Sequence, residues 1–174
     1  QGWRAHDFFR LRLRRATEKK DQAIKECIRL WERLLLALEG TNDEFMVAVR
    51  EALSKPQEDI RCVAVQQLGN RGLKVGKTEA AVLELVGLLK DPSPRVQLAT
   101  AEQLKKLRHR AATPALMDVV SRSDVSMELR IQGIDALGQI ADPRAVPILV
   151  QRIFAGDPPT LVGPSVAALG IIKH

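Results

Sequence analysis

The sequence is poor in the residues that build metal and redox sites. It has two cysteines, Cys27 and Cys62, which lie far apart and outside any C-x-x-C pair. Its three histidines, His6, His109 and His174, are not grouped with either cysteine. Because zinc ligands recur at short, fixed spacings, these counts exclude a zinc site. We expect both cysteines to be buried thiols, joined by a disulfide only in an oxidising compartment.

Aromatic residues are also scarce, since Trp and Phe supply only 3% of the chain and Tyr is absent. No apolar stretch reaches the ~18 residues that a transmembrane helix requires, and no run of alternating β-branched residues predicts a strand. Hydrophobic residues still make up 45% of the 174 residues, which is ample for a core. These proportions favour one all-α domain that is packed from aliphatic and small side chains.

Residue spacings that are typical of catalytic sites are also absent from the sequence. The sequence has no Ser-His-Asp or Cys-His spacing, and no predicted helix places two close carboxylates beside a histidine. Gly72 and Gly76 precede Lys77, but the spacing of a phosphate-binding loop is not met and no strand comes before them. We therefore predict a protein that is not an enzyme and that holds no cofactor and no metal.

What the sequence does contain is an internal repeat. Apolar residues at helical spacing predict two successive helical hairpins, over 91–123 and 124–156. Matching residues stand 33 positions apart: Val96, Leu104, Leu107, Pro114 and Leu116 correspond to Leu129, Leu137, Ile140, Pro147 and Leu149. Ser93, Thr113 and Asp142 each precede a proline and predict helix starts, because a capping oxygen and a proline are both favoured there.

The period extends in both directions. The upstream copy, 55–90, has three extra residues, which we place in an enlarged hairpin loop over 70–77, and the last copy, 157–174, holds only a first helix. The pattern [V/I/L]-R-x-x-[A/G]-x-x-[A/Q]-L-G, at 60–69 and again at 129–138, resembles the HEAT repeat, and most nearly its short bacterial variety first noted in phycobiliprotein lyases. The middle copy departs from this pattern, because Gln97 and Lys105 replace arginine and glycine.

The resemblance implies an all-α, right-handed α-solenoid of about three and a half HEAT-like hairpins over 55–174. Residues 1–54 precede the repeats, and we predict that they form an N-terminal helical cap. This cap has a basic first segment, an amphipathic helix over 18–39 and a helix over 42–54. Some HEAT-like proteins bind iron through paired His-Glu motifs, and this sequence has no such dipeptide.

In the family that this chain resembles, the second helices of the hairpins line a concave groove. We expect those helices over 79–90, 114–122 and 144–154. Their predicted core residues are Leu83, Leu116, Val119, Leu149 and Val150. Their predicted partner-binding residues are Asp118, Arg122, Arg144, Gln151 and Arg152. Arg122 and Arg152 are the best anchors for an acidic partner, and the alternative is that both only oppose their helix dipoles.

The net charge of +6 is unevenly distributed and predicts a second surface. Basic residues gather where the first helix of a hairpin ends. We define this basic ridge as Arg71, Lys74, Lys77, Lys105, Lys106, Arg108 and Arg110. It is either ordinary solvated charge or a site for an acidic partner or a nucleic-acid backbone.

The first residues combine aromatic and basic side chains, with Trp3, Phe8 and Phe9 among five arginines. Residues 1–16 are therefore either a capping helix or a segment that contacts an anionic membrane. We favour a cytoplasmic location, with tethering to a membrane through a segment outside this chain as the alternative. We predict a non-catalytic protein–protein interaction or scaffold module. The alternatives are a nucleic-acid-binding module and an accessory subunit of a lyase or chaperone type.

Overall fold

The computed structural model describes residues 25, 28–30, 32–33, 42–75, 78–155 and 157–172. These residues form helices and turns, and none of them belongs to a strand. The chain divides into two compact units, Gln1–Ala52 and Leu53–His174. The predicted basic segment and most of the predicted helix over 18–39 lie outside the described residues, so those two features stay predictions.

The described part of the first unit consists mainly of helix α3 (Asn42–Leu53). Its apolar residues recur at helical spacing and bury one side, with Phe45, Val49 and Ala52 at most 1% exposed. On another side of the helix, Glu51 forms an ion pair with Arg33 at 2.6 Å. This helix coincides with the one predicted over 42–54.

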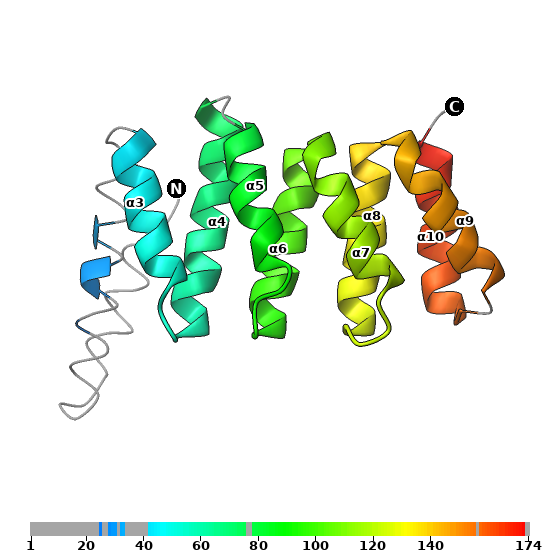
Figure 1. Cartoon of the computed structure of the whole chain (residues 1–174), viewed down its shortest axis with the longest axis horizontal. Helices are drawn as coiled ribbons and strands as arrows, with labels where there is room; N and C mark the ends of the chain where they lie inside the picture. Colours follow the sequence, from blue (N-terminus) through cyan, green and yellow to red (C-terminus); the bar gives the residue numbers. More distant parts are fainter. Residues whose placement is uncertain are drawn as a thin grey trace, which may run out of the picture. The chain divides into compact units, whose positions relative to one another are not determined.

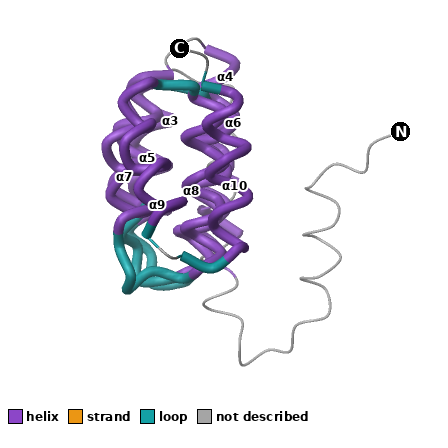
Figure 2. The backbone as a smooth tube through the Cα atoms, turned by 90° about the vertical axis from the view of Figure 1, so that its right-hand side faces the viewer, coloured by secondary structure: helices purple, strands orange, loops and turns teal. Residues whose placement is uncertain are grey.

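The second unit is a stack of helical hairpins in two layers (Figures 1 and 2). The first helices form one layer: α4 (Glu58–Val75), α6 (Pro94–Leu107), α8 (Met127–Ile140) and α10 (Pro159–Ile171). The second helices form the other layer: α5 (Thr78–Leu88), α7 (Thr113–Ser121) and α9 (Val146–Phe154). Short 3₁₀ helices, η2 (Arg110–Ala112) and η3 (Pro143–Ala145), lead into α7 and α9. The predicted all-α solenoid is confirmed.

The core of the second unit lies between these two layers. One leucine of each hairpin's first helix, Leu68, Leu104 or Leu137, is at most 1% exposed. Leu116 and Leu149 of the second helices are fully buried opposite them. Each such side chain stabilises the stack by roughly 1.5–3 kcal/mol relative to an exposed one.

The predicted helix starts are partly right. Asp142 caps η3, because its Oδ1 accepts the N–H of Arg144 at 3.1 Å. Ser93 is the N-cap residue of α6, but its hydroxyl donates to Glu58 Oε2 at 2.5 Å instead of capping. Thr113 was expected to cap α7 and is instead its first residue, and its hydroxyl donates to Asp142 at 3.0 Å.

The three extra residues of the first repeat do not enlarge its loop. Helix α4 continues to Val75 and α5 begins at Thr78, so the extra residues lengthen the first helix. The stretch is otherwise made of residues that tolerate a helix, and a single Gly72 costs only about 1 kcal/mol there. Consequently, Arg71 and Lys74 of the predicted basic ridge lie on a helix and not in a loop.

Two predicted core residues are exposed. Leu83 is 63% exposed and Val150 is 36% exposed. In α5 the buried residues are Val82, which directly precedes Leu83, and Leu85. A shift of one residue turns a helical side chain by about 100° around the axis, so the 33-residue period placed Leu83 on the wrong side. Val150 follows the buried Leu149 directly and is turned away from the core by the same angle.

Candidate protein-interaction face

The second helices turn one side away from the first helices and towards solvent. Val82 of α5, Leu116 of α7 and Leu149 of α9 are buried, and counting one, two and five residues onward from each gives three rows that turn outward. The first row is Leu83, Met117 and Val150; the second is Glu84, Asp118 and Gln151; the third is Gly87, Ser121 and Phe154. We call these three rows the second-helix face.

The first row of this face is apolar in every repeat. Leu83 and Val150 are exposed, and Met117 between them is half-buried. Phe154 extends the apolar surface at the end of α9 and is 83% exposed. Single exposed apolar residues are common, but a line of them at equivalent positions marks a surface for binding.

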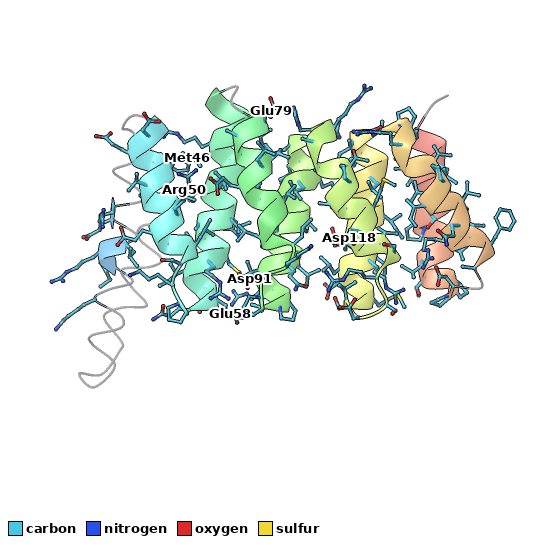
Figure 3. The ribbon with its side chains drawn as sticks, viewed as in Figure 1. Met46, Arg50, Glu58, Glu79, Asp91 and Asp118 are labelled. Carbon is cyan, nitrogen blue, oxygen red and sulfur yellow. The ribbon has the colours of Figure 1, made fainter. Side chains whose placement is uncertain are left out.

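The charges on this face are acidic. Asp118 of the second row is exposed on α7, and Glu79 is exposed one turn before Leu83 on α5; both are labelled in Figure 3. Neither of these two helices contains a lysine or an arginine. The single basic residue of α9 is Arg152, whose side chain is only 14% exposed and lies 3.4 Å from Asp157.

Two of the predicted partner-binding arginines, Arg122 and Arg144, lie just after α7 and just before α9, and each is held by a nearby carboxylate. Arg122 follows α7 and donates two hydrogen bonds to the Asp124 carboxylate, from Nε at 2.9 Å and from Nη2 at 2.6 Å. The hydrogen bond from Arg122 lowers the pKa of Asp124. Arg144, in η3, pairs with Asp142 at 2.6 Å. A partner that uses these arginines must displace their carboxylates, and their role as anchors stays a prediction.

Arg144 also ties two loops together, since its Nη2 donates to the carbonyl of Arg110 at 3.0 Å. The ion pair with Arg144 also changes the pKa of Asp142. The hydrogen bond from Arg144 is the main reason that the pKa of Asp142 falls to about 2, against the opposing effect of burial. This arrangement positions the start of η3, and hence of α9, against the preceding hairpin.

The basic ridge is interleaved with acidic and amide groups. Lys106 pairs with Glu102 at 2.7 Å, and Lys105 lies 3.9 Å from Asp135 of the next hairpin. Arg108, which ends α6 in the left-handed conformation at φ 49°, donates to Gln139 at 2.6 Å. The whole of Lys77 and the side chain of Lys74 lie outside what the structure describes. Nucleic-acid binding by this ridge therefore stays a prediction.

A buried ion pair joins the first two hairpins, whose second helices contribute to the second-helix face. Arg61 of α4 donates to both carboxylate oxygens of Asp91 at 2.9 Å, and their side chains are only 9% and 5% exposed. The same guanidinium donates to the carbonyls of Lys55 and Pro56. Burial raises the pKa of Asp91, but the bonds from Arg61 and from the Ser93 N–H outweigh it, so the pKa is lowered overall.

The described residues offer little for metal or redox chemistry. Among them, no group of three or more His, Cys, Asp and Glu is placed to hold a metal ion. Cys62 is buried and unpaired, and burial raises the pKa of its thiol. Cys27 lies outside the described residues. In the same part of the chain, no helix combines the length and the apolar character that crossing a bilayer needs.

Stacked hairpins with buried junctions define this chain as an α-solenoid repeat protein. The sequence model of HEAT repeats matches residues 46–127 and 82–170, which together cover most of the chain. The chain belongs to the HEAT-repeat family, and the predicted resemblance is confirmed. HEAT repeats generally mediate protein interactions.

The chain is also similar to a protein named deoxyhypusine hydroxylase-B, from Oryza sativa subsp. japonica. The two are 31% identical over 129 residues, which is 72% of this chain. The match spans 40% of the length of that relative. The relative carries the name of an enzyme, so this similarity does not confirm the prediction of a non-catalytic role.

The sequence itself carries a signal for the apolar row. Leu83, Met117, Val150 and Phe154 are apolar at positions where a solvated helix side is normally polar. The fixed period assigned Leu83 and Val150 to the core, which left Met117 and Phe154 without a shared surface. Only the observed rotation of α5 brings the four residues onto one face.

Proposed function

We propose that this HEAT-repeat chain is a non-catalytic protein-interaction module whose second-helix face binds an apolar segment of another protein. The supporting observation is the apolar row of Leu83, Met117 and Val150, which Phe154 extends. This row is not needed to hold the solenoid together, because the same helices already bury Leu85, Leu116 and Leu149. A helix laid in contact with such a row buries apolar side chains from both partners.

The charge on the face indicates what else the bound segment carries. Glu79 and Asp118 are exposed beside the apolar row, on helices without basic residues. Complementary charge across an interface favours the right partner and speeds its association. We therefore propose an amphipathic helix with lysine or arginine on its polar side. This proposal replaces the acidic partner expected from Arg122 and Arg152, since Asp124 and Asp157 already occupy those arginines.

A matched pair of labelled peptides tests this proposal. Both peptides are amphipathic helices with the same leucine pattern, one with lysine and the other with glutamate at its polar positions. Fluorescence anisotropy is expected to show tighter binding of the lysine peptide at low salt. The double substitution Leu83→Asp with Val150→Asp should weaken that binding at least tenfold, because it places charge in the apolar row. The melting temperature should change little, since Leu83 is 63% exposed and Val150 is 36% exposed.

The control variant is Leu73→Asp. Leu73 is 51% exposed, but it lies on α4 in the other layer. It should bind the lysine peptide like the wild type. The proposal is wrong if the double variant binds as well as the wild type, or if the glutamate peptide binds as tightly as the lysine peptide.

A further inference from the structure

The charges of the second-helix face are unevenly distributed along the stack. Helix α5 contains two carboxylates, Glu79 and Glu84, and no basic residue. Helix α7 contains one carboxylate, Asp118, and no basic residue. Helix α9 contains no carboxylate, and its single charged residue is Arg152. The formal charge of the three helices therefore rises from −2 through −1 to +1 along the stack.

The apolar surface is distributed in the opposite sense. The third row of the face changes from Gly87 on α5 to Ser121 on α7 and to Phe154 on α9. Gly87 and Ser121 are exposed although a further hairpin packs next to each of them, so this position faces solvent within a continuing stack. On α9 it holds an aromatic ring that is 83% exposed. The second-helix face thus has an acidic end on α5 and an apolar end on α9.

The arginines at the apolar end do not make that end strongly basic. Arg152 lies 3.4 Å from Asp157, and Arg144, just before α9, pairs with Asp142 at 2.6 Å. Each of these positive charges is therefore offset by a carboxylate of a neighbouring loop. A basic partner meets attraction at α5 and little repulsion at α9, whereas an acidic partner meets repulsion at α5.

A helix that contacts the whole apolar row lies across all three second helices. Leu83, Met117 and Val150 come from α5, α7 and α9, which follow one another along the stack (Figure 1). Successive packed helices lie roughly 10 Å apart, so the row is about 20 Å long. At ~1.5 Å per residue, about 13 residues of a bound helix span it. The two ends of such a helix therefore meet different charges.

We infer, resting on the function proposed above, that the bound helix lies in one direction, with a basic N-terminal half on α5 and an apolar C-terminal half on α9. Lysines or arginines in the first half would lie near Glu79 and Asp118, and a large apolar side chain in the second half would cover Phe154. The N-terminus of a helix also carries a partial positive charge, which is favoured beside carboxylates. Side-chain charge and helix dipole agree in this direction only. The partner is thus a segment whose basic residues precede its apolar ones.

A peptide and its reversed sequence test the direction. Both are amphipathic helices with acetylated and amidated ends, the same composition and the same spacing of leucines; one has its lysines in the N-terminal half, the other in the C-terminal half. Fluorescence anisotropy should show about two- to fivefold tighter binding of the peptide with N-terminal lysines. A photo-crosslinker at its N-terminus should attach to residues 78–88, and one at its C-terminus to residues 146–154, as mapped by mass spectrometry.

Glu79→Gln should weaken binding of the peptide with N-terminal lysines about two- to fivefold and narrow the difference between the two peptides. The control is Glu128→Gln, which removes the same charge from an exposed glutamate on α8, in the other layer, and should change neither affinity. Equal affinities of the two peptides, or crosslinks from one peptide end to both α5 and α9, would overturn this inference and leave the proposed function standing. Failure of both peptides to bind would overturn the two together.

Discussion

The two junctions between the complete hairpins are closed in different ways. At the first junction, between α4 and α6, Arg61 holds Asp91 in a buried ion pair. At the second, between α6 and α8, Gln97 stands in the place of the arginine and donates to the Asp91 carbonyl at 2.7 Å. The aspartate equivalent to Asp91 is Asp124, which is exposed and pairs with Arg122 of its own loop.

The second junction is tied at its opposite end instead. Thr113 of α7 donates its hydroxyl to the buried Asp142, in the loop before η3. Lys105 occupies the place of Gly69 and reaches Asp135 at 3.9 Å. These two junctions each hold a buried polar link, and the two links lie at opposite ends of the hairpins. This explains how the middle repeat departs from the family pattern and still packs.

The largest expected effect is at the first junction. Asp91→Ala should lower the free energy of unfolding by about 3–5 kcal/mol, because it leaves a buried arginine without its carboxylate. Urea unfolding followed by circular dichroism measures this. The control is Asp124→Ala at the equivalent position, where the ion pair is exposed and its loss should destabilise the protein much less. Equal losses for the two variants would show that the junctions do not differ.

The close approach of the helices at the first junction gives the second prediction. Gly69→Ala should cost up to about 3 kcal/mol, because the new Cβ would lie 2.9 Å from the Cβ of Gln103. Gly87→Ala is the control, since a Cβ there meets nothing within 4 Å and the change should gain up to about 1 kcal/mol of helix propensity. A stable Gly69→Ala variant would mean that the two helices separate easily.

The third prediction concerns pH and the second junction. The pKa of Asp142 is about 2 in the folded protein, against an ordinary value of 3.8. The unfolded chain therefore binds the proton first, and the stability that this group contributes is present above about pH 4 and is lost as the pH falls to about 2. The loss should be roughly 2 kcal/mol. Urea unfolding measured across this pH range should show that Asp142→Asn flattens the stability profile.

The smallest expected effect comes from restoring the arginine of the family pattern. Gln97→Arg alone should change the free energy of unfolding by less than about 0.5 kcal/mol, because Asp124 is already paired with Arg122. Adding Arg122→Ala releases Asp124, and the double variant should then be more stable than the sum of the two single changes by up to about 1 kcal/mol. A coupling of zero would indicate that the loop before α8 cannot turn its aspartate inwards.

Much of this architecture follows from the sequence without any structure. The 33-residue spacing of Leu104 and Leu137 identified a repeat, and the arginine–leucine–glycine pattern identified its family. Both depend only on which residues a helix must bury, so they are visible in one chain. The uncharged stretch before Lys173 was equally visible, and it sets α10 apart from every earlier first helix.

Other features were decided only by the tertiary structure. Whether Leu83 or Val82 faces the core depends on how α5 leaves the extended α4, and one residue of difference turns the side chain by about 100°. Whether Asp91 or Asp142 links a junction depends on which carboxylate reaches a donor in the neighbouring hairpin. The acidic, apolar second-helix face depends on the same geometry. A residue's position in the sequence determines which helix and which repeat it belongs to. How that helix packs against the next hairpin determines whether the side chain is buried in the core, links two hairpins or lies on a binding surface.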